Sequence, residues 1–185
     1  MKVRLKGSLM MSQEIEIEFK NILTRAEFER LCNHFSFENE DFTLQHNHYF
    51  DTPSFMLKNK GCALRIRDKN DHLTLTLKQP HTAGLLETHQ SLSKEEAEAV
   101  KSGNPLPDGE VTRVLQAMSI PVSSLTYLGT LSTERAETVH ENGAIMLDHS
   151  FYLGTEDYEL EYESMEQKQG KEVFQTLLRD FDIPE

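Results

Sequence analysis

The sequence predicts an α+β fold in which about eight antiparallel strands close into a barrel, with a charged polar lumen and helices packed outside. Three observations carry this prediction. Residues 14–20 alternate strictly between charged and apolar side chains, and residues 158–163 repeat that alternation near the other end of the chain. Strands with basic residues lie between these two acidic segments. If the first and last strands are neighbours, all the charged faces converge on one interior.

The two acidic strands present carboxylates at every second position. The charged faces comprise Glu14, Glu16, Glu18 and Lys20 in the first strand, and Glu159, Glu161 and Glu163 in the last. The opposite faces are apolar, because successive side chains of a strand point to opposite sides. Like charges at alternate positions repel one another, and the cost falls when they meet cations. The pattern therefore favours nearby metal ions or basic side chains.

The basic complement lies in the middle of the chain. Arg65 and Arg67 share one face of a strand, Lys78 ends the next strand, and later segments add Glu87, Arg135 and Asp148. An antiparallel sheet with one face in water also alternates apolar and polar residues, so a solvated face remains the alternative for any single strand. The placement of acidic strands at both chain ends and basic strands between them favours a shared interior.

The remaining elements follow from capping signals and periodicity. Capping boxes at 24–27 and 93–96 predict helices over about 24–35 and from 93 to before Gly103. Apolar stripes predict a helix at 110–118 and a C-terminal helix whose buried face spans 173–181. The strands after the first are predicted at 44–51, 62–68, 72–79, 85–92, 126–139, 143–150 and 156–163. Asn142-Gly143 predicts a tight hairpin turn.

Length and composition limit the class of protein. The 185 residues fit one domain, which we place at 12–185 after a flexible extension over 1–11. We find no signal peptide and no stretch able to span a membrane. The net charge of −12 argues against binding to nucleic acid or to anionic membranes. Two cysteines, Cys32 and Cys62, are too few for a disulfide framework and indicate buried positions in a reducing cytoplasm.

The ordered set of motifs resembles the CYTH superfamily, which includes triphosphate tunnel metalloenzymes, thiamine triphosphatases and class IV adenylyl cyclases. The matching segments are Glu16-x-Glu18-x-Lys20, Tyr49-Phe50-Asp51-Thr52-Pro53, Leu64-Arg65-Ile66-Arg67, Lys78, Glu87, Arg135, Asp148 and Glu159-Leu160-Glu161. They cover nearly the whole chain, and the set is most similar to the small bacillus-type members. One departure is Glu134, because many relatives carry Lys before the arginine. We expect Glu134 to point away from the lumen, since adjacent strand residues face opposite ways.

The resemblance, together with side-chain chemistry, implies a metal-dependent hydrolase that cleaves a phosphoanhydride bond of a small-molecule triphosphate, with inorganic triphosphate as the first candidate. The implied catalytic set is Glu16, Glu18, Lys20 and Glu87. The implied substrate-binding set is Lys20, Arg65, Arg67, Lys78 and Arg135. The implied ligands of Mg²⁺ or Mn²⁺, hard cations that prefer oxygen, are Glu16, Glu18, Asp148, Glu159 and Glu161. Two alternatives stay open: a cyclase that makes cyclic AMP from ATP, and a noncatalytic binder of polyphosphate or an organic phosphate.

Other polar residues have weaker claims. His46 and His48 share a strand face and could ligate a metal, but with no third soft ligand evident a packed or solvent-facing pair is the preferred interpretation. Asp51 is expected to mark the end of a strand before a turn. His89 shares the face of Glu87, which makes it a candidate substrate contact or a surface residue. Glu14 and Glu163 are expected at the tunnel mouth.

Overall fold

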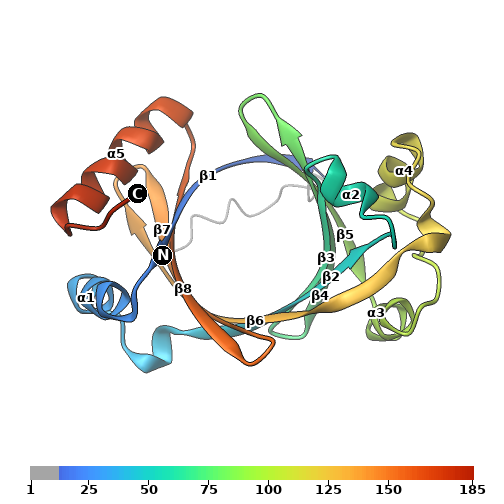
Figure 1. The fold of residues 1–185 in the computed structure, drawn as a ribbon, viewed down its shortest axis with the longest axis horizontal. Coiled ribbons are helices and arrows are strands. Elements are labelled where there is room, and N and C mark those ends of the chain that lie inside the picture. The colour runs from blue at the N-terminus through green and yellow to red at the C-terminus, as the bar shows by residue number, and fades with distance from the viewer. Residues whose placement is uncertain (1–12) are drawn as a thin grey trace, which may run out of the picture.

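The computed structural model describes residues 13–185, and in it eight antiparallel strands close into a barrel with helices on the outside (Figure 1). The predicted fold class is confirmed. The predicted extension over residues 1–11 and the first residue of the predicted domain lie outside the described residues. Within these residues no helix is long and apolar enough to cross a membrane.

The barrel follows the order β1-β5-β4-β3-β2-β6-β7-β8. Its strands are β1 (Gln13–Leu23), β2 (Thr43–Asp51), β3 (Ala63–Lys69), β4 (His72–His81), β5 (Gly84–Leu92), β6 (Thr126–His140), β7 (Gly143–Tyr152) and β8 (Thr155–Ser164). The barrel closes where β1 pairs with β8, and Lys20 lies opposite Glu161 there. The expected meeting of the first and last strands is therefore confirmed.

The helices form two groups on opposite sides of the barrel (Figure 1). Their bounds are α1 (Arg25–Phe35), α2 (Met56–Asn59), α3 (Lys94–Lys101), α4 (Glu110–Ala117) and α5 (Gln167–Asp180). Both predicted capping boxes are present, with Thr24 before α1 and Ser93 before α3. The hydroxyl of Ser93 accepts the backbone N–H of Glu96 at 3.1 Å, and the Glu96 carboxylate accepts the N–H of Ser93 at 2.8 Å. These bonds satisfy backbone donors that a helix start leaves unpaired.

The hydrophobic core lies outside the barrel wall, in two parts. On one side the outward leucines and isoleucines of β3 and β4 pack against α3 and α4. On the other side the outward residues of β7 and β8 pack against α1 and α5. Because these four strands bury their apolar faces against helices, their other faces are left for the lumen. Removal of apolar surface from water thus fixes which side chains point inward.

Some local structure was not predicted. The short helix α2 was missed, and so were the 3₁₀ turns at Asn39–Asp41 and Val122–Ser124. A four-residue helix is too short for apolar periodicity, and α2 depends on the buried carboxylate of Asp51. That carboxylate accepts the backbone N–H groups of Thr52, Leu57 and Lys58 at 2.7, 2.9 and 3.0 Å. Asp51 therefore ends its strand, as expected, and also supports the next helix.

The hairpin between β6 and β7 forms as predicted but one residue earlier. His140 pairs with Gly143, so the two loop residues are Glu141 and Asn142, and Gly143 is already in the strand. A Cβ at Gly143 would lie 2.3 Å from the backbone oxygen of Glu163. This glycine therefore serves close strand packing rather than the turn. The C-terminal helix also begins earlier than its apolar face suggested, at Gln167.

Candidate functional site

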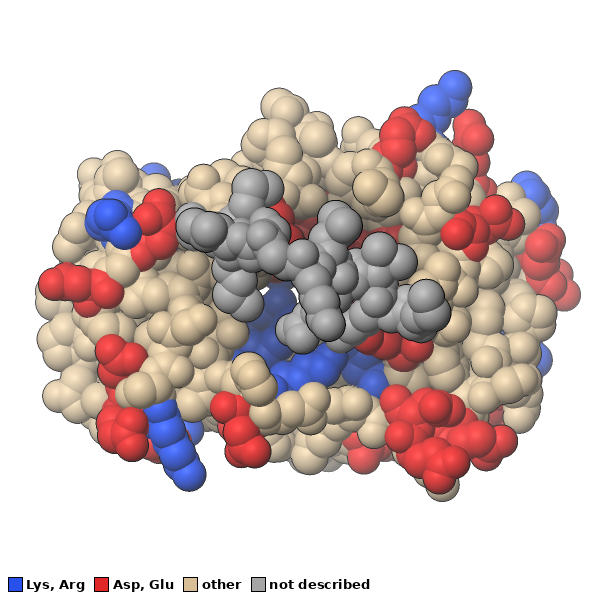
Figure 2. All heavy atoms as spheres, turned by 180° about the vertical axis from the view of Figure 1, so that it is seen from behind, with Lys and Arg blue, Asp and Glu red and all other residues tan. Residues whose placement is uncertain are grey.

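The barrel encloses a cavity of about 350 Å³ that receives side chains from all eight strands. Its charged lining comprises Glu16, Glu18, Lys20, Arg65, Arg67, Lys78, Arg135, Asp148, Glu159 and Glu161. Figure 2 shows Lys and Arg side chains on the wall of the central hollow. Five carboxylates and five cations thus surround one space, in a chain whose overall charge is strongly negative.

Arg135 has the most extensive ion pairing of the cavity wall. Its guanidinium donates to both oxygens of Asp148, at 2.6 and 2.5 Å, and to Glu161 at 2.6 Å. Burial disfavours its charge, yet these two carboxylates outweigh burial and raise the pKa of Arg135. The paired planar groups fix the guanidinium in one orientation. Arg135 is therefore a rigid, permanently charged part of the wall.

Lys78 lies between two carboxylates from the neighbouring part of the barrel. Its ammonium contacts Glu16 on β1, and Glu87 Oε1 on β5 at 2.8 Å. Arg65 approaches the same Glu87 oxygen at 3.7 Å. Burial opposes ionisation of Glu87, but Lys78 and Arg65 outweigh it and lower the pKa of Glu87. Glu87 does not line the cavity itself; it sits behind the two cations and holds them.

Arg67 differs from the other cations of the cavity. Its Nε donates to Asn47 Oδ1 at 3.2 Å, and it forms no ion pair with a carboxylate among the described residues. Burial, with the nearby charges of Arg65 and Arg135, lowers the pKa of Arg67 to about 10. A buried cation without a counter-ion attracts an anion strongly. Arg67 is thus the point of the cavity best prepared to receive negative charge.

Among the carboxylates that line the cavity, Glu159 is the one that forms no ion pair with any described residue. No ion pair or hydrogen bond of its carboxylate occurs within residues 13–185, and Lys20 contacts Glu18 at 3.1 Å and Glu161 at 3.6 Å instead. Burial, together with the charges of Glu161, Asp148 and Glu18, raises the pKa of Glu159 to about 7. A carboxylate in this position gains from a nearby cation.

Sequence reasoning missed the neutral part of the lining, most of it on β2 and β6. These side chains are Gln45, Asn47, Tyr49, Ala63, Leu85, Leu131, Thr133 and Ser150. Gln45 is 1% exposed, and its Oε1 has no hydrogen-bond partner in the described part of the chain. The alternation of side chains along a strand could have identified Gln45, Asn47 and Tyr49. These three residues point to the face opposite His46 and His48, which the sequence analysis considered as possible metal ligands.

The structure also places the residues with weaker claims. His46 and His48 point outward and bond the hydroxyls of Ser132 and Thr130 at 2.8 and 2.7 Å, which fits the preferred interpretation of a packed pair. Glu134 is exposed on the outer side of β6, away from the lumen. Cys32 and Cys62 are both free; Cys62 is buried as expected, whereas the expected burial of Cys32 is wrong, because its side chain is only half-buried.

A closed barrel whose lumen carries five cations opposite five carboxylates defines a class of proteins with a charged tunnel. The CYTH domain family matches residues 14–184, which is nearly the whole chain. The protein belongs to this family.

Individual relatives agree with this assignment. The chain is 50% identical over 175 residues to the Bacillus subtilis protein "Putative triphosphatase YjbK", covering 95% of this chain and 90% of that protein. A crystal structure from Bacillus halodurans described as "a putative adenylate cyclase" is 48% identical, with a TM-score of 0.91 over 95% of this chain and 94% of the other. A Hippeastrum protein described as a "putative adenylyl cyclase" with a dominant triphosphatase activity superposes with a TM-score of 0.71, covering 92% of this chain and 89% of that one. Its identity of 24% shows the shared fold alone.

Proposed function

We propose that this protein is a metal-dependent hydrolase that cleaves a phosphoanhydride bond of a small-molecule triphosphate, with inorganic triphosphate as the first candidate. The observation that supports this most is the enclosure of five cations and five carboxylates around one cavity. Phosphoryl transfer depends mainly on positioning and on neutralising the charge of phosphate oxygens. The name of the Bacillus subtilis relative supports the same class of reaction.

The basic side chains of the cavity would contact phosphate in different ways. Arg67 has no counter-ion among the described residues, so it is available to phosphate without breaking an existing ion pair. Arg65 offers planar donors that can match two phosphate oxygens at once, whereas Lys20 and Lys78 act as point charges. Arg135, held by Asp148 and Glu161, adds a fixed positive charge to the same wall. Glu87 holds Lys78 and Arg65 from behind, so its proposed role is to position these two cations.

The carboxylates fit a hard divalent cation. Within residues 13–185 Glu159 has no ion-pair partner and is costly to ionise alone, and Glu16, Glu18 and Glu161 line the same cavity with oxygen donors. These four side chains would hold Mg²⁺ or Mn²⁺. Asp148 uses both oxygens on Arg135, so in the present arrangement it positions that guanidinium rather than a metal. A bound ion would neutralise phosphate charge and activate the attacking water, with Glu16 and Glu18 beside the phosphate-binding Lys20.

One observation favours a cyclase as the second candidate. Tyr49 and Leu131 line both the charged cavity and an adjoining pocket, which is largely apolar and also contains Leu128 and Tyr152. Such a pocket could hold the flat base of a nucleoside triphosphate whose phosphates enter the cavity. The cyclase reaction would use the ribose hydroxyl in place of water.

A substrate panel separates these functions. The protein is incubated with inorganic triphosphate, pyrophosphate, thiamine triphosphate or ATP, each with Mg²⁺ or Mn²⁺, and phosphate and cyclic AMP are measured. Phosphate release from triphosphate without cyclic AMP supports the proposal, and cyclic AMP from ATP identifies the cyclase. Tight binding with no turnover under either metal identifies a noncatalytic phosphate binder.

We place the activity in the cytoplasm, where Cys32 and Cys62 would stay reduced.

A further inference from the structure

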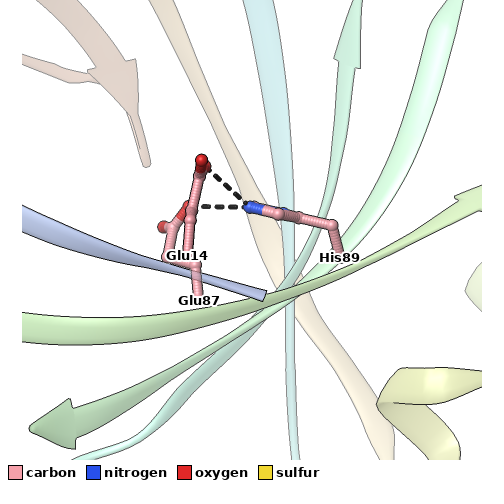
Figure 3. Close-up of side chains that lie close together, drawn as sticks. All are labelled: Glu14, Glu87 and His89. Carbon is pink, nitrogen blue, oxygen red and sulfur yellow. Dashed lines mark hydrogen bonds and ion pairs between the residues drawn. The ribbon is translucent and has the colours of Figure 1, made fainter. Parts of the chain in front are cut away.

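Three side chains that the proposed reaction does not combine lie close together (Figure 3). They are Glu14, near the start of β1, and Glu87 and His89 on β5. His89 Nε2 lies 3.1 Å from Glu14 Oε1 and 3.3 Å from Glu87 Oε2. Their three ligand atoms all lie within 4.8 Å of one another, so a single ion could contact all of them.

We propose that Glu14, Glu87 and His89 form a binding site for a divalent transition metal such as Zn²⁺, separate from the Mg²⁺ or Mn²⁺ ligands of the cavity. One imidazole nitrogen and two carboxylate oxygens form a donor set that suits Zn²⁺. Mg²⁺ prefers oxygen ligands and water, so the imidazole discriminates against it. The site does not depend on which triphosphate, if any, the protein hydrolyses.

The orientation of the His89 ring is fixed from the opposite side. Its Nδ1 lies 3.0 Å from the hydroxyl of Thr76, which is buried on the paired strand β4. A metal at Nε2 requires the proton to be on Nδ1, and the Thr76 oxygen can accept that hydrogen bond. Partners of this kind orient a ligating histidine and set its tautomer. The ring therefore directs Nε2 at the two carboxylates.

Glu87 connects this site to the charged cavity. Its Oε1 contacts Lys78 at 2.8 Å, while Oε2 faces His89. One carboxylate thus has an oxygen for each neighbour, and a metal at Oε2 need not displace Lys78. Glu87 is 5% exposed, so it supplies a fixed ligand, whereas the exposed Glu14 lies on the open side.

The local charge also favours a cation. Glu163 lies on the inward face of β8, close enough to Glu14 and Glu87 for the three charges to interact. No ion pair of Glu163 occurs within the described chain. Three carboxylates therefore share this end of the tunnel, and a divalent ion would relieve their mutual repulsion.

The same chain contains a natural control. His149 also lies between two glutamates, but it contacts Glu134 through Nδ1 at 3.7 Å and Glu156 through Nε2 at 2.8 Å. These carboxylates are on opposite edges of the ring, so one ion cannot contact all three side chains. His89 differs because both of its carboxylates face the same nitrogen.

The test is titration with Zn²⁺ by calorimetry in excess Mg²⁺ without substrate, on the wild type and on His89→Gln, Glu14→Gln and His149→Gln. We expect His89→Gln to weaken Zn²⁺ binding at least about tenfold and His149→Gln to leave it unchanged. Glu14→Gln should also weaken binding, and because Glu14 is exposed, a folding defect cannot explain that loss. Thr76→Val should weaken Zn²⁺ binding about 10-fold or more, because the His89 ring loses the hydrogen bond that orients it.

Nuclear magnetic resonance of the histidine ring nitrogens provides a second measurement. Zn²⁺ should shift the Nε2 signal of His89 and leave that of His149 in place. Equal Zn²⁺ affinity in wild type and His89→Gln, or an unmoved His89 signal, would overturn the proposed site. Because no substrate is present, that result would not bear on the proposed hydrolase. Conversely, a protein that hydrolyses no triphosphate but still binds Zn²⁺ at His89 would support the metal site and refute only the hydrolase.

Discussion

Replacement of Glu159 by glutamine should make the metal-free protein more stable at neutral and alkaline pH. Burial and neighbouring carboxylates raise the pKa of Glu159 to about 7 from its ordinary value of 4.5. At roughly 1.4 kcal/mol per pKa unit, that difference corresponds to about 3 kcal/mol. Glu159 is partly exposed, so water screens part of this cost. We therefore expect a gain of about 1–2 kcal/mol in the free energy of unfolding.

The sign of the effect sets its pH dependence. Below about pH 4.5 the carboxyl is protonated in both folded and unfolded chains, so it contributes no difference. Between about 4.5 and 7 the folded chain keeps a proton that the unfolded chain has lost, and stability falls as pH rises. Above pH 7 the full penalty is present. The gain from Glu159→Gln should therefore appear across this window and be absent near pH 4.

The measurement is urea unfolding at about pH 4 and about pH 8, with EDTA and then with Mn²⁺. Glu172→Gln on the exposed face of α5 is the matched control, because it removes the same charge far from the tunnel. Mn²⁺ should stabilise the wild type more than Glu159→Gln, and the variant should lose metal-dependent turnover. An unchanged stability at pH 8 would refute the account of Glu159, and equal stabilisation by Mn²⁺ would remove this residue from the metal site.

Three further predictions follow from other contacts. Arg67→Ala should lower kcat/KM for triphosphate by about 10- to 100-fold, as expected for one charged phosphate contact. Its melting temperature should stay the same or rise, because a half-buried cation with no counter-ion among the described residues is lost. The exposed Arg113→Ala should change neither quantity, and wild-type kcat/KM in Arg67→Ala would contradict the assignment. Asp51→Ala should lower the free energy of unfolding by about 2–3 kcal/mol, since three backbone N–H groups lose their acceptor, and denaturant titration that finds no loss would show that α2 holds without it. Gly84→Ala should destabilise the β1–β5 pairing, because its Cβ would lie 2.2 Å from the backbone oxygen of Glu16 and φ is +151°; amide exchange no faster in β1 than in wild type would argue against this.

The sequence predicted the barrel well because one physical rule decides it. Strands that alternate apolar and charged residues must bury the apolar side, so the inward direction of Glu16, Arg65 and Glu159 follows from the pattern alone. Helices with a capping box and an apolar stripe were equally predictable. The short helix α2 was not, because it depends on a carboxylate seven residues before its third residue.

The candidate site was predictable as a set of residues but not as a set of pairs. Parity places ten charged side chains around one cavity. It does not say that Arg135 takes both oxygens of Asp148, or that Arg67 and Glu159 form no ion pair within residues 13–185. These choices depend on cross-strand register and on side-chain conformation, which sequence spacing does not contain. The meeting of Glu14 with His89 likewise depends on the β1–β5 register.

The closure of the barrel has a consequence for how the chain folds. Phe19 pairs with Tyr162, which is 143 positions further along the sequence, whereas most other strand pairs join neighbours in the chain. Contacts between distant segments carry a larger loop-closure entropy and form slowly, so we expect the β1–β8 seam to close last. That seam places Glu18 opposite Glu163 and Lys20 opposite Glu161, with Glu159 further along β8. The final folding step therefore gathers four carboxylates around one cation, and added salt should accelerate it by screening their net repulsion.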